Sequence, residues 1–171
     1  QTTDGQTGVV TTTTYAQTPP YSGMPLTTEQ RTGDNQVISE ATNTLATNTT
    51  IRGGMQPFID ITKQTNYQVG SDLTVRELET TVSDNNYDGW GNLTQSEVSV
   101  YATKVATTPL HQTLTVNEFG EPDSWQQQKG RWQNTTVSKT LAGQSTISRL
   151  SEFGYHAENA TCEGVEQPRG M

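Results

Sequence analysis

Large apolar side chains are scarce in this chain, and this scarcity limits the folds open to it more than any other feature. Leu, Ile, Val and Phe together make up less than a fifth of the 171 residues. Such a composition is typical of disordered chains, but the charged fraction is only 16% and Thr supplies about one residue in five. Thr is β-branched and suits a half-exposed pleated surface. The composition therefore predicts an ordered β protein without a thick hydrophobic core of its own.

Short segments of alternating apolar and polar residues indicate β-strands. In PFIDIT, Ile59 and Ile61 fall on one face, and Phe58, Asp60 and Thr62 fall on the other. SEVSVYA and QTLTVNE alternate in the same way, and turn-forming segments such as RGGM, VGSD and LAG separate these runs. The segment DLTVRELETTV has a weak helical pattern, but its Thr and Val residues favour a strand. We expect an all-β fold of Thr-rich antiparallel strands, arranged as a sandwich or as a solenoid-like repeat.

Two parts are expected along the chain. Residues 1–34 contain three of the seven prolines and no helical periodicity, so we expect an extended arm with GVVTTTTYA as its one strand-like segment. Residues 35–171 are expected to form a single β domain. Within it, Ser-Glu recurs at intervals of 57 and 55 residues, at Ser39, Ser96 and Ser151. Two interpretations remain open, a degenerate strand-turn repeat and chance recurrence in a Thr-rich chain.

Charge and hydropathy exclude two classes of partner. The net charge is -8 and the pI is near 4.6, whereas binding to nucleic acid requires clustered Lys and Arg. No segment approaches the roughly 18 consecutive apolar residues that a membrane span requires. The scarcity of Lys and the abundance of Thr, Gln, Asn and Gly favour a secreted or cell-surface protein. Cys162 is the only cysteine, so no disulfide can form within the chain.

One segment, DNNYDGWGNLT at residues 84–94, has the pattern of a metal site. Asp84, Asn86 and Asp88 alternate and a Gly follows, as in a calcium-coordinating loop. A regular helix-loop-helix site would have Glu at the twelfth position, where this chain has Gln95. Two interpretations remain, a looser calcium loop and a hairpin corner in which Asp-Gly makes the turn. We expect the corner, and no cofactor other than this candidate calcium ion.

No catalytic constellation is recognisable, and we expect a protein that is not an enzyme. His111 and His156 have no Cys or His at ligand spacing, and no G-x-S-x-G motif is present. Asn-x-Thr sequons give weak support for glycosylation, since chance produces several in so Thr-rich a chain; they begin at Asn48, Asn92, Asn134 and Asn159. Five aromatic residues could form a sugar-stacking platform or fill a thin core: Trp90, Trp125, Trp132, Tyr87 and Tyr101.

The Thr-, Asn- and Gln-rich texture of residues 35–165, with its ATNTT-like segments and NYDGWGN, resembles the secreted repeat adhesins of bacterial surfaces. In this respect the chain is similar to the holdfast-anchoring adhesins of stalked alphaproteobacteria, which are secreted through a curli-type outer-membrane pore. The regular Gln and Asn ladders of the curli subunits are missing, and no site residue carries over. The resemblance implies a cell-surface fibre or anchor component that binds neighbouring protein subunits and polysaccharide.

These observations favour an extracellular structural or adhesive protein that assembles into a surface fibre or anchor. The expected mechanism is strand addition between subunits, with residues 8–16 as the donated strand. Two alternatives share the same composition: a calcium-stabilised carbohydrate-binding module, and a phage or virus fibre domain.

Overall fold

The computed structural model describes residues 1–50, 52–120 and 132–153, together with two short strands near the C-terminus. These residues contain strands and no helix, so the prediction of an all-β antiparallel fold is confirmed. The segment with a weak helical pattern lies largely in a strand that begins at Val75. In the described part of the chain, no helix could span a bilayer.

Ten strands form the main sheet. They are β1 (Thr2–Thr3), β2 (Val10–Tyr15), β3 (Pro25–Arg31), β4 (Val37–Thr49), β5 (Met55–Val69), β6 (Val75–Tyr87), β7 (Leu93–Tyr101), β8 (His111–Phe119), β9 (Trp132–Leu141) and β10 (Ile147–Glu152). A separate antiparallel pair consists of β11 (Thr161–Cys162) and β12 (Val165–Glu166).

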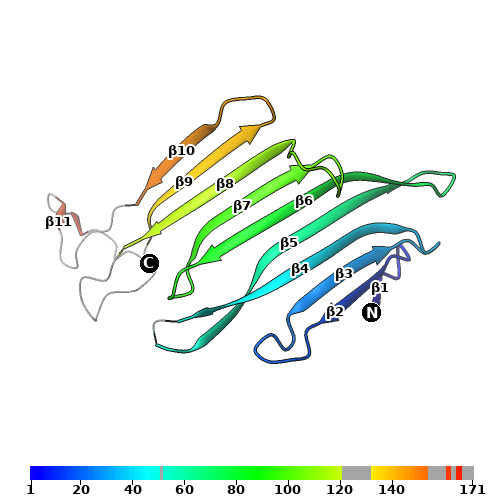
Figure 1. Ribbon diagram of the computed structural model, residues 1–171, viewed down its shortest axis with the longest axis horizontal. Coiled ribbons are helices and arrows are strands. Elements are labelled where there is room, and N and C mark those ends of the chain that lie inside the picture. Colours follow the sequence, from blue (N-terminus) through cyan, green and yellow to red (C-terminus); the bar gives the residue numbers. More distant parts are fainter. Residues whose placement is uncertain (51, 121–131, 154–160, 163–164, 167–171) are drawn as a thin grey trace.

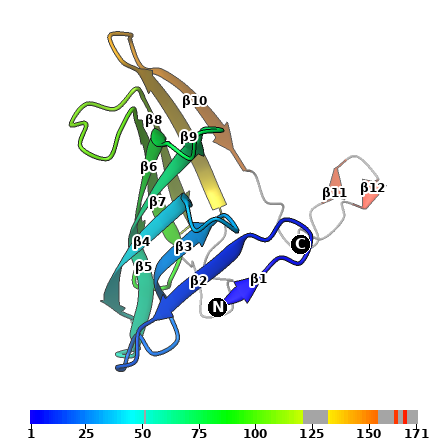
Figure 2. The same ribbon diagram turned by 90° about the vertical axis from the view of Figure 1, so that its right-hand side faces the viewer.

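The main sheet is a meander in which each strand pairs antiparallel with the next one along the chain (Figure 1). The sheet does not close on itself, because β1 and β10 are its two ends. Figure 2 shows β2 and β10 on the same side of the central strands, so the single layer is curled. Right-handed strand twist, accumulated over ten strands, produces this kind of curvature.

Residues 1–34, expected to form an extended arm, contain β1, β2 and β3, and all three belong to the main sheet. β3 pairs with β4 from Thr27 opposite Thr42 to Arg31 opposite Val37. The segments VTTTTY and PLTTEQR have the β-branched residues that suit a pleated ladder. No break in pairing therefore separates this part of the chain from residues 35 onward.

The three Ser-Glu dipeptides lie on β4, β7 and β10, at every third strand. Strands three apart in an antiparallel meander run in opposite directions. A three-strand repeat in this sheet would therefore be inverted from one copy to the next. Each interval, of 57 or 55 residues, spans three strands of the meander. This spacing fits both a duplication and a chance recurrence, so the two interpretations stay open.

Several hairpin turns place one residue in the left-handed region of backbone conformation. Gly91, between β6 and β7, has φ of 88°, and a Cβ there would lie 2.6 Å from Gln56 Nε2. Glycine meets both requirements, because it has no Cβ. Between β5 and β6 the same region is occupied by Leu73, with φ of 62°, so that turn is strained.

The sheet has almost no hydrophobic core. Among the described residues, the buried apolar ones are Ala16 and Val100, and buried polar residues outnumber them: Thr65, Thr80, Ser99 and Asn117. Large apolar side chains such as Val105 and Ile147 are instead exposed. A single sheet offers no second layer against which these side chains could be buried.

Hydrogen bonds between directly opposed side chains take the place of apolar packing. Thr14 Oγ1 lies 2.6 Å from Thr27 Oγ1, and Ser138 Oγ lies 2.7 Å from Ser148 Oγ. Both pairs are cross-strand partners in the ladder. Such pairs stabilise a sheet by about 0.2–1 kcal/mol each. The abundant hydroxyl side chains therefore support strand pairing directly.

Candidate functional site

The structure separates the three residues of the candidate calcium loop. Asp84 and Asn86 lie on β6, opposite Glu97 and Gln95 of β7, whereas Asp88 lies in the turn after β6. A strand rises by about 3.3 Å per residue, so Asp84 and Asp88 are spread along extended backbone rather than wrapped around one point. The described residues also contain no group of three or more His, Cys, Asp or Glu that could hold a metal ion.

Asp88 organises the turn between β6 and β7. Its Oδ1 accepts hydrogen bonds from the backbone N–H groups of Trp90 and Asn92, at 2.8 and 2.9 Å, and its Oδ2 accepts one from Asn92 Nδ2 at 2.9 Å. Asn48 Nδ2 on β4 donates to the backbone carbonyl oxygens of Tyr87 and Asp88. These contacts are those of a hairpin corner held by its own carboxylate and braced from β4.

The sequon asparagines have structural partners wherever the structure describes them. The amides of Asn48 and Asn92 hold the turn after β6, and Asn134 Nδ2 donates to Glu118 Oε2 at 2.7 Å. A glycan on any of these nitrogen atoms would compete with an existing hydrogen bond. The sequon at 159, His156 and Trp125 lie outside the described residues.

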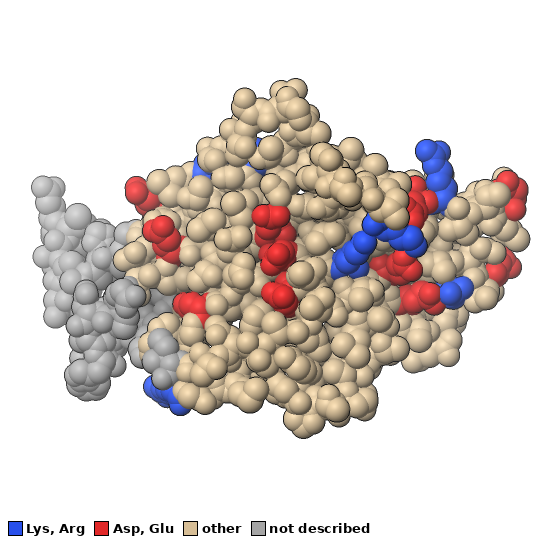
Figure 3. Space-filling model, viewed as in Figure 1, with Lys and Arg blue, Asp and Glu red and all other residues tan. Residues whose placement is uncertain are grey.

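A charged cluster fixes the loop between β7 and β8 to the sheet. Lys104 Nζ lies 3.4 Å from Glu40 Oε1, 3.7 Å from Glu77 Oε1 and 3.3 Å from the Tyr67 hydroxyl, which itself donates to Glu40. Lys63 Nζ donates to the Lys104 carbonyl oxygen at 2.9 Å. Figure 3 shows acidic and basic side chains side by side on one part of the visible face, while most of that face carries neither.

This cluster changes the ionisation of two of its members. Burial raises the pKa of the Tyr67 hydroxyl, and its hydrogen bond to Glu40 raises that pKa further. The pKa of Lys104 is also raised, first by its hydrogen bond with Tyr67 and then by the charge of Glu40. Sequence reasoning did not find this cluster, because its members come from four separate segments of the chain.

An open cavity of about 330 Å³ lies beside the cluster. Its lining includes the Tyr101 ring, the hydroxyl-bearing side chains of Thr80, Thr103 and Thr107, and the side chain of Lys104. Hydroxyl groups beside an aromatic ring can bind a sugar through hydrogen bonds and stacking. The sequence pointed to Tyr101 as an aromatic candidate but not to the loop that completes this cavity.

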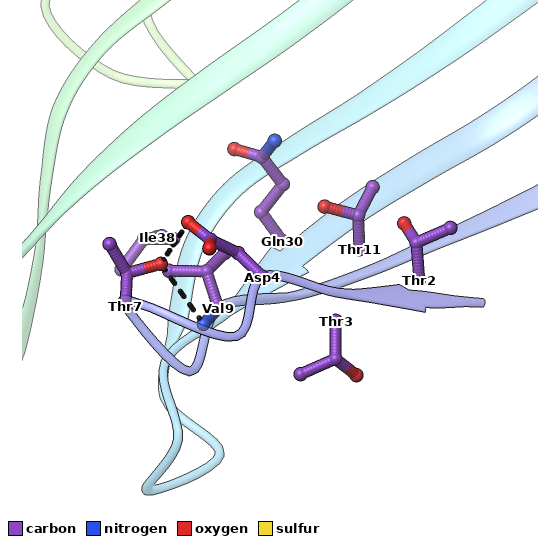
Figure 4. Close-up of a pocket in the computed structure, with 8 residues that line it drawn as sticks. All are labelled: Thr2, Thr3, Asp4, Thr7, Val9, Thr11, Gln30 and Ile38. Carbon is purple, nitrogen blue, oxygen red and sulfur yellow. Dashed lines mark hydrogen bonds between the residues drawn. The ribbon is translucent and has the colours of Figure 1, made fainter.

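A second open cavity, of about 470 Å³, lies at the N-terminal end of the sheet (Figure 4). Asp4 lies at its rim, where Oδ2 accepts a hydrogen bond from Thr7 Oγ1 at 2.6 Å and Oδ1 accepts one from the Gln6 N–H. The hydrogen bond from Thr7 lowers the pKa of Asp4. These contacts close the turn between β1 and β2, so they account for the charge of Asp4 without a ligand.

No family model, curated protein or solved structure matches this chain.

The backbone edges at the two ends of the sheet are open among the described strands. β1 covers β2 only at Val10 and Thr11, so the outer side of Thr12–Tyr15 has no neighbouring strand. β10 pairs with β9 along one side and has no described neighbour along the other. Soluble proteins usually protect such edges with Lys, Pro or bulges. Neither strand contains Lys or Pro, and the β9–β10 ladder has no register shift; the β2–β3 ladder has one between Thr14 and Tyr15, and β10 carries the charges of Arg149 and Glu152.

The alternation of an antiparallel ladder shows which backbone groups face outward. On β10 the Phe153 N–H donates to the Gln133 carbonyl oxygen of β9, so the odd-numbered residues face β9 and Ser148, Leu150 and Glu152 face the open side.

The same alternation applies to β2. The Asp4 N–H bonds to the Val9 carbonyl oxygen, and the Ala16 N–H bonds to the Met24 carbonyl oxygen. Odd-numbered residues of β2 therefore face away from β3, so the N–H and C=O of Thr13 point to the open edge.

Proposed function

We propose that this chain is an extracellular structural or adhesive protein that assembles by strand addition between copies, forming a surface fibre or anchor. The observation that carries the proposal is a single-layer sheet with open backbone edges and almost no buried apolar side chains. The secreted or cell-surface location is supported by the acidic, Lys-poor and Thr-rich composition.

An isolated copy of this sheet has little apolar burial to stabilise it. Ordering each residue costs about 1–2 kcal/mol of backbone entropy, and burial returns about 25 cal/mol per Å² of apolar surface. With Ala16 and Val100 as the buried apolar residues of the described chain, an isolated copy gains little from burial. Pairing an open edge with another copy satisfies exposed N–H and C=O groups and covers apolar side chains.

β2, in the N-terminal segment, is one of the two strands with an open edge for this pairing; the other is β10. Residues 8–16, expected from the sequence as the donated strand, include all of β2. β2 is bound to β3 along one side, so it would contribute its outer edge rather than detach from the sheet. The backbone groups of Thr13 are available for a neighbouring strand.

The proposal is tested by removing one outward N–H from each edge. Proline tolerates an edge strand but cannot donate a hydrogen bond. The double variant Thr13→Pro, Leu150→Pro is compared with Thr13→Val, Leu150→Val, which keeps both N–H groups. Sedimentation over a wide concentration range should show concentration-dependent oligomers for the natural chain and the Val variant, and a loss of oligomers for the Pro variant. A rigid monomer at every concentration of the natural chain would end the proposal.

A second candidate function, carbohydrate binding, is favoured by the cavity beside Lys104. The Tyr101 ring and neighbouring hydroxyl groups suit a polysaccharide partner. A glycan array probed with and without calcium distinguishes a sugar-binding surface from the calcium-stabilised module considered above. Tyr101→Ala should remove binding to this cavity, whereas Tyr21→Ala, on the connection between β2 and β3, should not.

A further inference from the structure

We propose that two copies of this chain pair antiparallel along their β10 strands, with Leu150 of one copy opposite Leu150 of the other. This inference rests on the proposed assembly by strand addition and specifies the edge, the partner and the register. The partner is a second copy of the same chain, because the β10 edge is complementary to itself.

Apolar side chains are concentrated at this edge. Ile147 is 77% exposed, Leu150 is 56% exposed and Phe153, which follows the strand, is 46% exposed. They recur every third residue on a strand whose outer side has no described neighbour. Ile147 and Phe153 face one side of the sheet and Leu150 faces the other, so exposed apolar side chains flank the unpaired backbone on both faces of this edge.

Ladder geometry limits the registers that two β10 strands can adopt. Opposed residues must present their side chains to the same face, and outward backbone groups must meet outward backbone groups. Ser148, Leu150 and Glu152 have the outward groups, so each must pair with an even-numbered residue of the other copy. The twofold axis that relates the two copies then lies between the same residue of each strand. Three residues near the middle of β10 could take this position: Arg149, Leu150 and Ser151.

The side chains distinguish these three registers. Centring on Arg149 places two arginines directly opposite each other, which is destabilising. Centring on Ser151 places Leu150 opposite Glu152 and Arg149 opposite Phe153, so two of the three apolar side chains face a charged one.

Centring on Leu150 places apolar side chains opposite apolar ones and polar side chains opposite polar ones. Leu150 meets Leu150, Ile147 meets Phe153, Ser148 meets Glu152 and Arg149 meets Ser151. Ile147 and Phe153 would form a non-hydrogen-bonded pair, the kind in which opposed side chains approach most closely. Only this register covers all three exposed apolar residues without opposing like charges.

Phe153 is already positioned for this contact. Its N–H donates to the Gln133 carbonyl oxygen at 2.9 Å, which extends the β9–β10 ladder one residue past the end of β10. Its ring contacts Trp132 edge to face, with centroids 6.0 Å apart. The surface that would receive Ile147 of the second copy is therefore ordered before pairing, which lowers the entropic cost of association.

Disulfide trapping reads the register directly. In a Cys162→Ser background, single cysteines replace Arg149, Leu150 or Ser151. Leu150→Cys should form a homodimer under mild oxidation, because paired Cα atoms lie about 5.5 Å apart, within the range of a disulfide. Arg149→Cys and Ser151→Cys should cross-link at least about tenfold more slowly, since each lies about 7–8 Å from its own counterpart. Faster cross-linking at 149 or 151 overturns the proposed register.

A charge variant tests the edge without cysteine. Leu150→Lys places two like charges on the axis and should raise the dissociation constant of the dimer by at least about tenfold in sedimentation equilibrium. Leu78→Lys is the matched control: Leu78 is 53% exposed and lies at the register shift between β5 and β6, in an interior strand away from both ends of the sheet. Oligomers that persist unchanged in Leu150→Lys, with no cross-link at 150, overturn the β10 interface while leaving strand addition through β2 in place. A natural chain that is monomeric throughout overturns both proposals.

Discussion

Thr65 of β5 and Thr80 of β6 lie directly opposite each other, and their hydroxyl oxygens are 2.9 Å apart. Both are buried, with 2% and 1% of their surfaces exposed. In most proteins the most buried pair of neighbouring strands would be apolar. Here a hydroxyl pair occupies that position, because the fold has too few large apolar side chains for every interior place.

Because Thr65 and Thr80 bond to each other, the stability losses of their single substitutions should not add up in the double variant. Thr80→Val removes one hydroxyl and leaves the buried Thr65 hydroxyl without its partner, which should cost about 1–2 kcal/mol of unfolding free energy. The double variant Thr65→Val, Thr80→Val removes both hydroxyls and keeps the shape, so it should be close to the natural chain or more stable. Urea unfolding of the four proteins of this cycle measures the coupling. A double variant that loses the sum of the two single losses would contradict the pair as described.

The turn after β6 predicts different costs for its two aspartates. Asp88→Ala removes three hydrogen bonds within the corner and should lower the unfolding free energy by about 1–2 kcal/mol. Asp84→Ala should cost about 1 kcal/mol or less, because Asp84 lies opposite Glu97 and its removal relieves repulsion between like charges.

The same two variants test the candidate calcium site. Melting temperatures are measured with calcium and with a chelator. We expect no difference for the natural chain. A marked rise with calcium in the natural chain that disappears in Asp84→Ala would show instead that the segment binds the ion.

The strained turn between β5 and β6 predicts a stabilising substitution. Leu73 has φ of 62° and is 51% exposed, so replacing it by Gly relieves strain while little packing is lost. Leu73→Gly should raise the unfolding free energy by about 0.5–1 kcal/mol, the cost of the left-handed conformation less the entropy of glycine. Asn35→Gly is the control: Asn35 has φ of 65°, but asparagine tolerates this region, so the change should be near zero. Equal effects at both positions would argue against strain at Leu73.

The Lys104 cluster predicts a loss of stability at alkaline pH. The pKa values of Lys104 and Tyr67 are both raised in the folded chain. The unfolded pKa of each group is about 10. Because the pKa is higher in the folded chain, the contribution of each group to the unfolding free energy is complete below about pH 10 and is lost as the pH rises through the folded pKa. Melting temperature should therefore fall more steeply above about pH 10 in the natural chain than in the double variant Lys104→Met, Tyr67→Phe, which removes both titrating groups. Lys139→Met, on β9, should keep the steep fall, and identical curves for all three would contradict the cluster.

Removing residues 1–16 predicts a soluble chain that assembles poorly. The truncation deletes β1 and β2 and leaves β3 as the new edge. β3 contains Pro25 and the ion pair between Glu29 and Arg31, whose Nε–Oε1 distance is 2.6 Å, and both features discourage edge pairing. Analytical ultracentrifugation compares the two chains at equal concentration. Assembly equal to that of the full chain would show that the N-terminal edge takes no part.

Local properties could be predicted well from the sequence because they depend on neighbouring residues. The alternation in PFIDIT and in SEVSVYA predicts strands; β5 contains the first segment, and β7 contains the second except for its last residue. Glycine and aspartate indicated where the turns lie. The turn after β6 is shorter than the segment DNNYDGWG, because β6 continues to Tyr87 and Asp88 is the residue that holds the turn. Alternating polar residues suit a strand as well as a loop, so the pattern of Asp84 and Asn86 could not locate that boundary.

Which strands are neighbours was decided by the tertiary structure. Nothing local to VTTTTY distinguishes a free arm from a strand of the sheet; the difference is its pairing with β3. Lys104 meets Glu40 across 64 positions of sequence, and the charge of neither residue indicates the other.

The sequence by itself determined that this chain would be rich in β-strands and in Thr and would lack a large hydrophobic core, since composition and periodicity are properties of single segments. Only the tertiary structure decided that ten strands form one open layer, that a threonine pair is buried at its middle, and that β10 and most of β2 are left with an open edge. The physical reason is that hydrogen-bonded pairing joins residues far apart in the chain, and its register depends on all the strands together.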